Sequence, residues 1–179
     1  MNFNSVQFVG FLAVALVLFW STRGATRRSV LLLTSYVFYG LWDWRFLALL
    51  IVMSGFTYAV GLGLRPPVTD NEPSSSARRS GRLLLVGIVG NLAVLALFKY
   101  FNFFTDSLFE LLRGVGFSGD SPALRLFLPI GISFYVFESI SYLVDIHGAK
   151  VEPERDPVKV GLFLSYFPKA LAGPIERPR

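Results

Sequence analysis

The sequence contains no cysteine, a single histidine and few charged residues. Without cysteine, disulfide bonds, thiolate nucleophiles and cysteine-ligated metal sites are excluded. Charged residues make up 16% of the 179 residues, against roughly 25% in ordinary soluble domains. The histidine, His147, has no nucleophile elbow around it, and GxGxxG, P-loop, HExxH, GxSxG and EF-hand patterns are also missing. Because these motifs are missing, we expect no catalytic residue and no metal site in this chain.

Apolar residues are abundant instead. They make up 53% of the chain, including 18 phenylalanines, and the mean hydropathy is +0.55. They stand in long blocks rather than at amphipathic spacing, which is typical of an integral membrane protein. The net charge of +5 comes from scattered or juxtamembrane basic residues. This pattern predicts contact with the lipid bilayer and not with nucleic acid.

The apolar blocks predict an all-α integral membrane protein, in which residues 1–179 form a single transmembrane region. Residues 6–20 are not preceded by basic residues, so we expect a retained first helix and not a signal peptide. Residues 29–42 would reach only about 21 Å, short of the roughly 30 Å hydrocarbon core. Counting this segment, we expect about five membrane spans, an amphipathic helix at the interface over 102–113, and a partial last segment over 160–175. The five spans are residues 5–22, 29–42, 46–64, 83–101 and 126–146.

Basic loops predict the orientation of these spans. Residues 21–28 contain three arginines, and residues 65–82 contain four together with three prolines and a serine run. The composition of 65–82 predicts a flexible linker, and the positive-inside rule places both loops in the cytoplasm. The N-terminus is then expected outside and the 147–158 loop inside.

Residues 126–147, LFLPIGISFYVFESISYLVDIH, carry four polar side chains on one helix face. At 100° per residue they lie within an arc of about 100°. A carboxylate at mid-depth should face protein or water, because exposure to lipid costs at least ~2.5 kcal/mol. The stripe either lines a substrate passage or forms a hydrogen-bond network between helices. Its residues are Glu138, Ser141, Tyr142 and Asp145.

Four blocks together resemble the N-terminal part of the membrane-bound O-acyltransferases, in particular the alginate O-acetylase branch. They are LLLTSYVFYGLWDWRFLALL (31–50), ALFKYFNFF (96–104), LPIGISFYVFESISYLVDIHG (128–148) and YFPKALAGPIERPR (166–179). The resemblance assigns structural motif positions to Lys99, Asn102, Pro129, Gly131, Ser133, Phe134, Pro168, Gly173 and Pro174.

The resemblance implies a many-helix enzyme of the bacterial inner membrane that passes acyl groups through a central tunnel. Alginate O-acetylases modify an exopolysaccharide with a periplasmic esterase-like partner. The acyl donor, acetyl-CoA or a carrier thioester, is implied as a substrate, with no bound cofactor. The family's catalytic histidine follows the AGPI block, so we expect an N-terminal fragment without it, and His147 does not inherit its role. The alternatives are a non-catalytic scaffold or accessory subunit, and a small transporter that uses Glu138.

Overall fold

The structure is a computed structural model that describes residues 6–64, 74–114, 129 and 131–169. These residues form helices and connecting turns without any β-strand, which confirms the all-α prediction. The helices are α1 (Val6–Ser21), α2 (Gly24–Trp42), α3 (Trp44–Gly63), α4 (Ser74–Gly114), α5 (Ile132–His147), α6 (Pro157–Ser165) and the 3₁₀-helix η1 (Phe167–Lys169).

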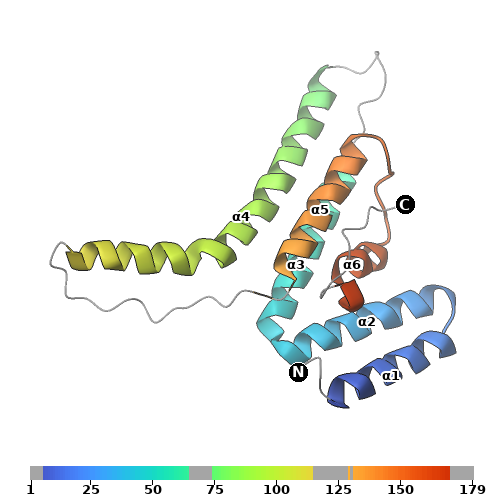
Figure 1. Cartoon of the computed structure of the whole chain (residues 1–179). Helices are drawn as coiled ribbons and strands as arrows, with labels where there is room; N and C mark the ends of the chain where they lie inside the picture. Colours follow the sequence, from blue (N-terminus) through green and yellow to red (C-terminus); the bar gives the residue numbers. More distant parts are fainter. Residues whose placement is uncertain (1–5, 65–73, 115–128, 130, 170–179) are drawn as a thin grey trace.

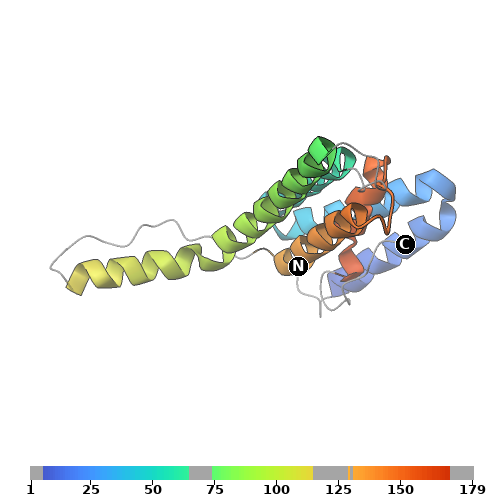
Figure 2. The same ribbon diagram turned by 90° about the horizontal axis from the view of Figure 1, so that it is seen from above.

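Helix α2 runs back along α1, α4 runs back along α3, and α5 runs back along α4, whereas α3 leaves the end of α2 at an angle (Figure 1 and Figure 2). The first half of α4 packs against α3 and α5, while α1 and α2 form an antiparallel pair inclined to these three. The start of α4 and the end of α5 lie together, because Ser80 Oγ and His147 Nδ1 are 3.3 Å apart. The start of α4 and the 148–156 segment after α5 are therefore at one end of the molecule.

Helix α2 is longer than the apolar block from which it was predicted. It begins at Gly24 and includes Arg27 and Arg28, giving 19 residues. At 1.5 Å per residue this is about 28 Å, close to a full bilayer crossing. The predicted basic loop is thus mostly helical, since arginine is a good helix former.

A one-residue corner joins α2 to α3. The Asp43 amide donates to Tyr39 O at 3.0 Å, which closes α2. The Asp43 carboxylate then accepts from the Arg45 amide at 2.8 Å, which caps α3. Aspartate is a favoured N-cap residue because its side chain satisfies an amide that lacks a helical partner.

Helix α4 corrects two predictions. It begins at Ser74, within the predicted linker, and it continues unbroken to Gly114. The segment 102–113 is therefore not a separate helix, since no proline or glycine stands between Asn91 and Arg113 to end α4. Figure 1 shows that the yellow half of α4 bends away from the other helices. Its predicted apolar stripe is exposed and includes Phe104, Leu108 and Leu111.

Two helices in the described part are long and apolar enough to cross a membrane. They are Trp44–Gly63 and Arg78–Gly114, and the apolar helix Gln7–Ser21 is shorter. The other predicted spans stay predictions: α2 carries a polar first turn, and α5, with 16 residues, reaches about 24 Å. The large apolar side chains exposed on α1, α3 and α4 fit a lipid environment.

Candidate functional site around Glu138 and Lys169

The chain enters α5 through a turn that only glycine adopts easily. Gly131 has a φ of 75°, in the left-handed region, and precedes the first residue of α5. The Pro129 carbonyl accepts a hydrogen bond from the Ile132 amide at 3.3 Å, and the Gly131 carbonyl accepts one from the Tyr135 amide at 3.1 Å. This is the tight helix entry that the Pro-Ile-Gly sequence predicts, and it fixes where Glu138 lies along α5.

Glu138 is buried near the middle of α5, with 5% of its surface exposed. Its Oε1 atom lies 3.6 Å from the Nζ atom of Lys169, whose side chain is 19% exposed. The carboxylate thus faces protein, as expected for an acidic residue at mid-depth. The sequence analysis missed Lys169 as the partner of Glu138. A signal was present, because the apolar segments 126–146 and 160–175 each contain a charged residue, and burying an unpaired charge is costly.

The loop after α5 and the short helix α6 together bring Lys169 to this height. The loop already lies beside α5, since the Glu154 amide donates to Tyr142 Oη at 3.0 Å, and Tyr142 is one helical turn from Glu138. Helix α6 then starts with Pro157 and is capped by Asp156, which accepts from the Val158 amide at 2.9 Å. The 3₁₀-helix η1 follows α6 and ends with Lys169 beside the carboxylate.

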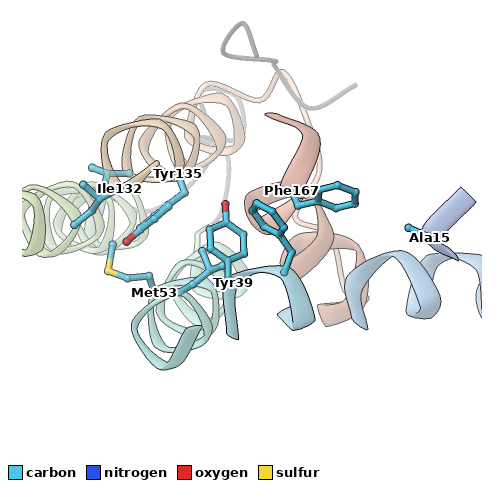
Figure 3. Packing of buried hydrophobic residues seen from close by; sticks show 9 residues of the cluster. Ala15, Tyr39, Met53, Ile132, Tyr135 and Phe167 are labelled. Atoms are coloured by element: carbon cyan, nitrogen blue, oxygen red, sulfur yellow. The ribbon is translucent and has the colours of Figure 1, made fainter. Parts of the chain in front are cut away.

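The turn that follows α6 is held by α1 and α2. The Phe167 amide donates to Ser35 Oγ at 3.4 Å, and the Phe167 ring lies 5.3 Å from that of Phe38 and 5.5 Å from that of Phe11. Figure 3 shows Tyr39 between Phe167 and Tyr135. Lys169 Nζ also lies 5.0 Å from the centre of the Phe163 ring, a cation–π contact. The position of the ammonium group is thus set by packing on several sides.

Tyr142 and Asp145, at the other end of the predicted stripe, hold a loop. Tyr142 Oη accepts from the Glu154 amide at 3.0 Å, and Asp145 Oδ1 lies 3.3 Å from Lys150 Nζ. Both side chains are buried. The predicted stripe therefore divides, because Glu138 meets a charge at mid-height while these two residues anchor the 148–156 segment.

Ser141 does not join either group. It is half-buried, at the edge of the exposed strip formed by Phe137 and Val144. The predicted polar stripe covered an arc of about 100° around the helix axis. Ser141 lies within that arc but at the border of the buried face, so it was included in the prediction. Whether the remaining stripe lines a tunnel stays a prediction.

Glu154 organises the loop outside the helices. Its Oε2 atom accepts from Lys159 Nζ at 2.8 Å, and its Oε1 atom accepts from the Arg155 and Asp156 amides. The hydrogen bond from Lys159, together with these backbone amides, lowers the pKa of the Glu154 carboxyl. Tyr58 Oη of α3 also donates to the Arg155 carbonyl at 2.8 Å. The loop is thus fixed to both α3 and α5.

The other motif residues are not gathered around Glu138. Lys99 is exposed, with Nζ 5.6 Å from the centre of the Tyr100 ring. Asn102 and Ser133 are half-buried, and Phe134 is exposed. Pro168 lies exposed in η1, next to Lys169, whereas Gly173 and Pro174 lie outside the described residues.

Comparison with known proteins identifies relatives along nearly the whole chain. The probable alginate O-acetylase AlgI of Pseudomonas aeruginosa is 36% identical over 167 residues, which cover 93% of this chain and 31% of that protein. The probable alginate O-acetylase AlgI of Azotobacter vinelandii is 37% identical over 169 residues, covering 94% of this chain and 32% of that protein. The peptidoglycan O-acetyltransferase of Helicobacter pylori is 28% identical over 191 residues, covering 93% of this chain and 34% of that protein.

The chain spans about a third of the length of the curated relatives it matches. No protein-family model and no solved structure matches it. The resemblance inferred from the four sequence blocks is confirmed by the relatives, and the chain is a homologue of the alginate O-acetylases along nearly all of its length.

Proposed function

We propose that this chain is an N-terminal part of a membrane-bound O-acetyltransferase that modifies an exopolysaccharide such as alginate. The observation that carries the proposal is the identity of 36–37% to alginate O-acetylases over at least 93% of the chain. The less similar peptidoglycan O-acetyltransferase shares the transferred group but not the acceptor. Acetyl transfer is therefore the common chemistry, and the more similar relatives favour an exopolysaccharide acceptor.

The proposed setting is the bacterial inner membrane, with several passes and the N-terminus outside. The exposed apolar side chains of α1, α3 and α4 support a lipid environment. Arg78, Arg79 and Arg82 stand at the start of α4, at the end of the molecule where Ser80 meets His147. The positive-inside rule favours the cytoplasm for this end. If α1, α2 and α3 each cross the bilayer, the N-terminus lies on the opposite side.

In this proposal the Glu138–Lys169 pair supports one wall of an acyl-transfer tunnel. Because the two charges are 3.6 Å apart, they compensate each other in a low-dielectric surrounding. The pair also joins α5 to the turn after α6, so the wall does not depend on apolar packing alone. The acyl donor would be acetyl-CoA or a carrier thioester, and a periplasmic esterase-like protein would complete the transfer.

The test measures bound acetate in cells that do and do not contain the protein. The gene is deleted in its native host, and ester-linked acetate is quantified in purified exopolysaccharide and in peptidoglycan. We expect the exopolysaccharide fraction to lose acetate and to regain it on complementation. Loss from peptidoglycan alone would refute the acceptor, and unchanged acetate in both fractions would refute acetyl transfer.

Two substitutions examine the proposed wall in the same cells. Glu138→Gln removes the negative charge with little change in shape, so we expect the acetate content to fall. Ser141→Ala alters a half-buried residue on the same helix and should leave the acetate content unchanged. Protein abundance is measured by immunoblotting, and equal acetate per protein in both variants would contradict a role for the charge.

A further inference from the structure

Three polar side chains are fully buried where α3, α4 and α5 meet. Thr57, Asn91 and Ser139 each have 0% of their surface exposed. Thr57 Oγ1, Asn91 Oδ1 and Ser139 Oγ have no hydrogen-bond partner among the described residues. The Asn91 amide nitrogen donates to Gly87 O at 2.8 Å, which sets the orientation of the amide and leaves its oxygen without a partner among the described residues. A buried polar atom without a hydrogen-bond partner lowers the free energy of unfolding by about 1–3 kcal/mol.

Packing around Leu143 places these three side chains at one level. A Cβ atom added at Gly87 of α4 would lie 2.6 Å from Leu143 Cδ1, and one added at Gly61 of α3 would lie 3.8 Å from Leu143 Cδ2. These three residues of α3, α4 and α5 therefore meet at a common height.

Each polar residue stands four positions from one of these contacts. Thr57 precedes Gly61 and Ser139 precedes Leu143, whereas Asn91 follows Gly87. Because α4 runs opposite to α3 and α5 (Figure 1), all three displacements point the same way and amount to about 6 Å. Side chains four residues apart share a helix face, so the three oxygens face the common interior.

We propose that Thr57, Asn91 and Ser139 bind an ordered water molecule that bridges α3, α4 and α5. Side chains at one level that are too far apart to bond one another are the usual setting for a bridging water, which typically makes about three hydrogen bonds. The amide oxygen accepts one bond, and each hydroxyl donates or accepts another. The three side chains are uncharged, so their chemistry suits water better than an ion. This inference is independent of the proposed acetyl transfer.

Thr57→Val and Ser139→Ala, alone and combined, test the shared site. Unfolding of the full 179-residue chain in detergent is followed by circular dichroism during titration with sodium dodecyl sulfate. We expect each single change to raise the unfolding equilibrium constant about tenfold, and the combined change to raise it little further, because either substitution removes the same water. Thr34→Val is the matched control, since Thr34 is buried but donates to Leu31 O within its own helix. It should change the constant less than threefold.

Additive single effects would refute a shared water, and neutral or stabilising single changes would refute a water site altogether. If the variants do not fold, brief radiolytic oxidation of the unmodified chain tests for the water instead. Met53 is 3% exposed and stands one turn from Thr57, so a neighbouring water should allow its rapid oxidation. Labelling of Met53 at the slow rate of a dry interior would overturn the proposal.

Discussion

Substitution of Gly87 by alanine tests how closely α4 approaches its neighbours. An added Cβ atom would lie 2.6 Å from Leu143 Cδ1 and 3.0 Å from Val60 Cγ1. Carbon atoms in ordinary contact are about 3.5–4.0 Å apart, so the neighbours would have to move by roughly 1 Å. Leu143 is fully buried and Val60 is nearly so, which leaves little room for that movement.

The expected magnitude combines two opposing effects. Overpacking of a well-packed core costs about 1–3 kcal/mol. Alanine is favoured over glycine inside a helix by about 0.5–1 kcal/mol. The clash is the larger effect, and we expect Gly87→Ala to lower the free energy of unfolding by about 1 kcal/mol. Gly55 of α3 has no atom within 4 Å of an added Cβ, so Gly55→Ala should be neutral or stabilising.

The assay is detergent unfolding of the full chain, with Leu143→Ala as a second background. In that background the clashing Leu143 methyl group is gone and only the 3.0 Å contact with Val60 Cγ1 is left, so Gly87→Ala should cost clearly less. The reasoning would be refuted if Gly87→Ala and Gly55→Ala had equal effects. An equal cost of Gly87→Ala in both backgrounds would likewise exclude the clash with Leu143 as its cause.

Three other predictions concern charges. Glu138→Gln and Lys169→Met should each lower the free energy of unfolding by about 3 kcal/mol, because removing one partner leaves a buried charge. In the same detergent titration, the double variant should recover most of this loss. The lowered pKa of Glu154 means that its contribution is complete above the ordinary value of 4.5 and is lost as the pH falls through the folded-state pKa. Amide exchange in residues 154–156, corrected for intrinsic rates, should therefore be constant above pH 4.5 and accelerate as the pH falls below it, and Lys159→Met should weaken this dependence. Asp43→Ala removes the cap of α3 and should cost about 1 kcal/mol in thermal or detergent unfolding, while Asp43→Asn should retain most of the stability.

Local chemistry was sufficient for several features of the fold. The apolar blocks predicted helices on both sides of residues 43–45, where the structure has the corner between α2 and α3, and a helix that contains Glu138. Burial of Glu138 followed from the cost of exposing a carboxylate to lipid. Each of these features depends on residues that are close together in the sequence, so pattern and propensity describe them well.

Helix boundaries were predicted less well where hydropathy changes inside a helix. The arginines of α2 and the serines at the start of α4 were assigned to loops, and the polar residues after Phe101 were assigned to a new helix. Hydropathy reports where a helix leaves an apolar environment, whereas the backbone continues until a residue or a contact ends it. No proline or glycine stands between Asn91 and Arg113, so α4 continues past Phe101.

The sequence by itself determined an all-helical, lipid-compatible chain, the kinship with O-acetylases, and a carboxylate that must be shielded. Only the tertiary structure decided that Lys169 shields Glu138, that Ser141 lies at the border of the exposed face, and that Thr57, Asn91 and Ser139 reach one level. The physical reason is distance along the chain. These arrangements depend on helix directions and on the path of the chain after α5, which combine residues from segments that no local periodicity connects.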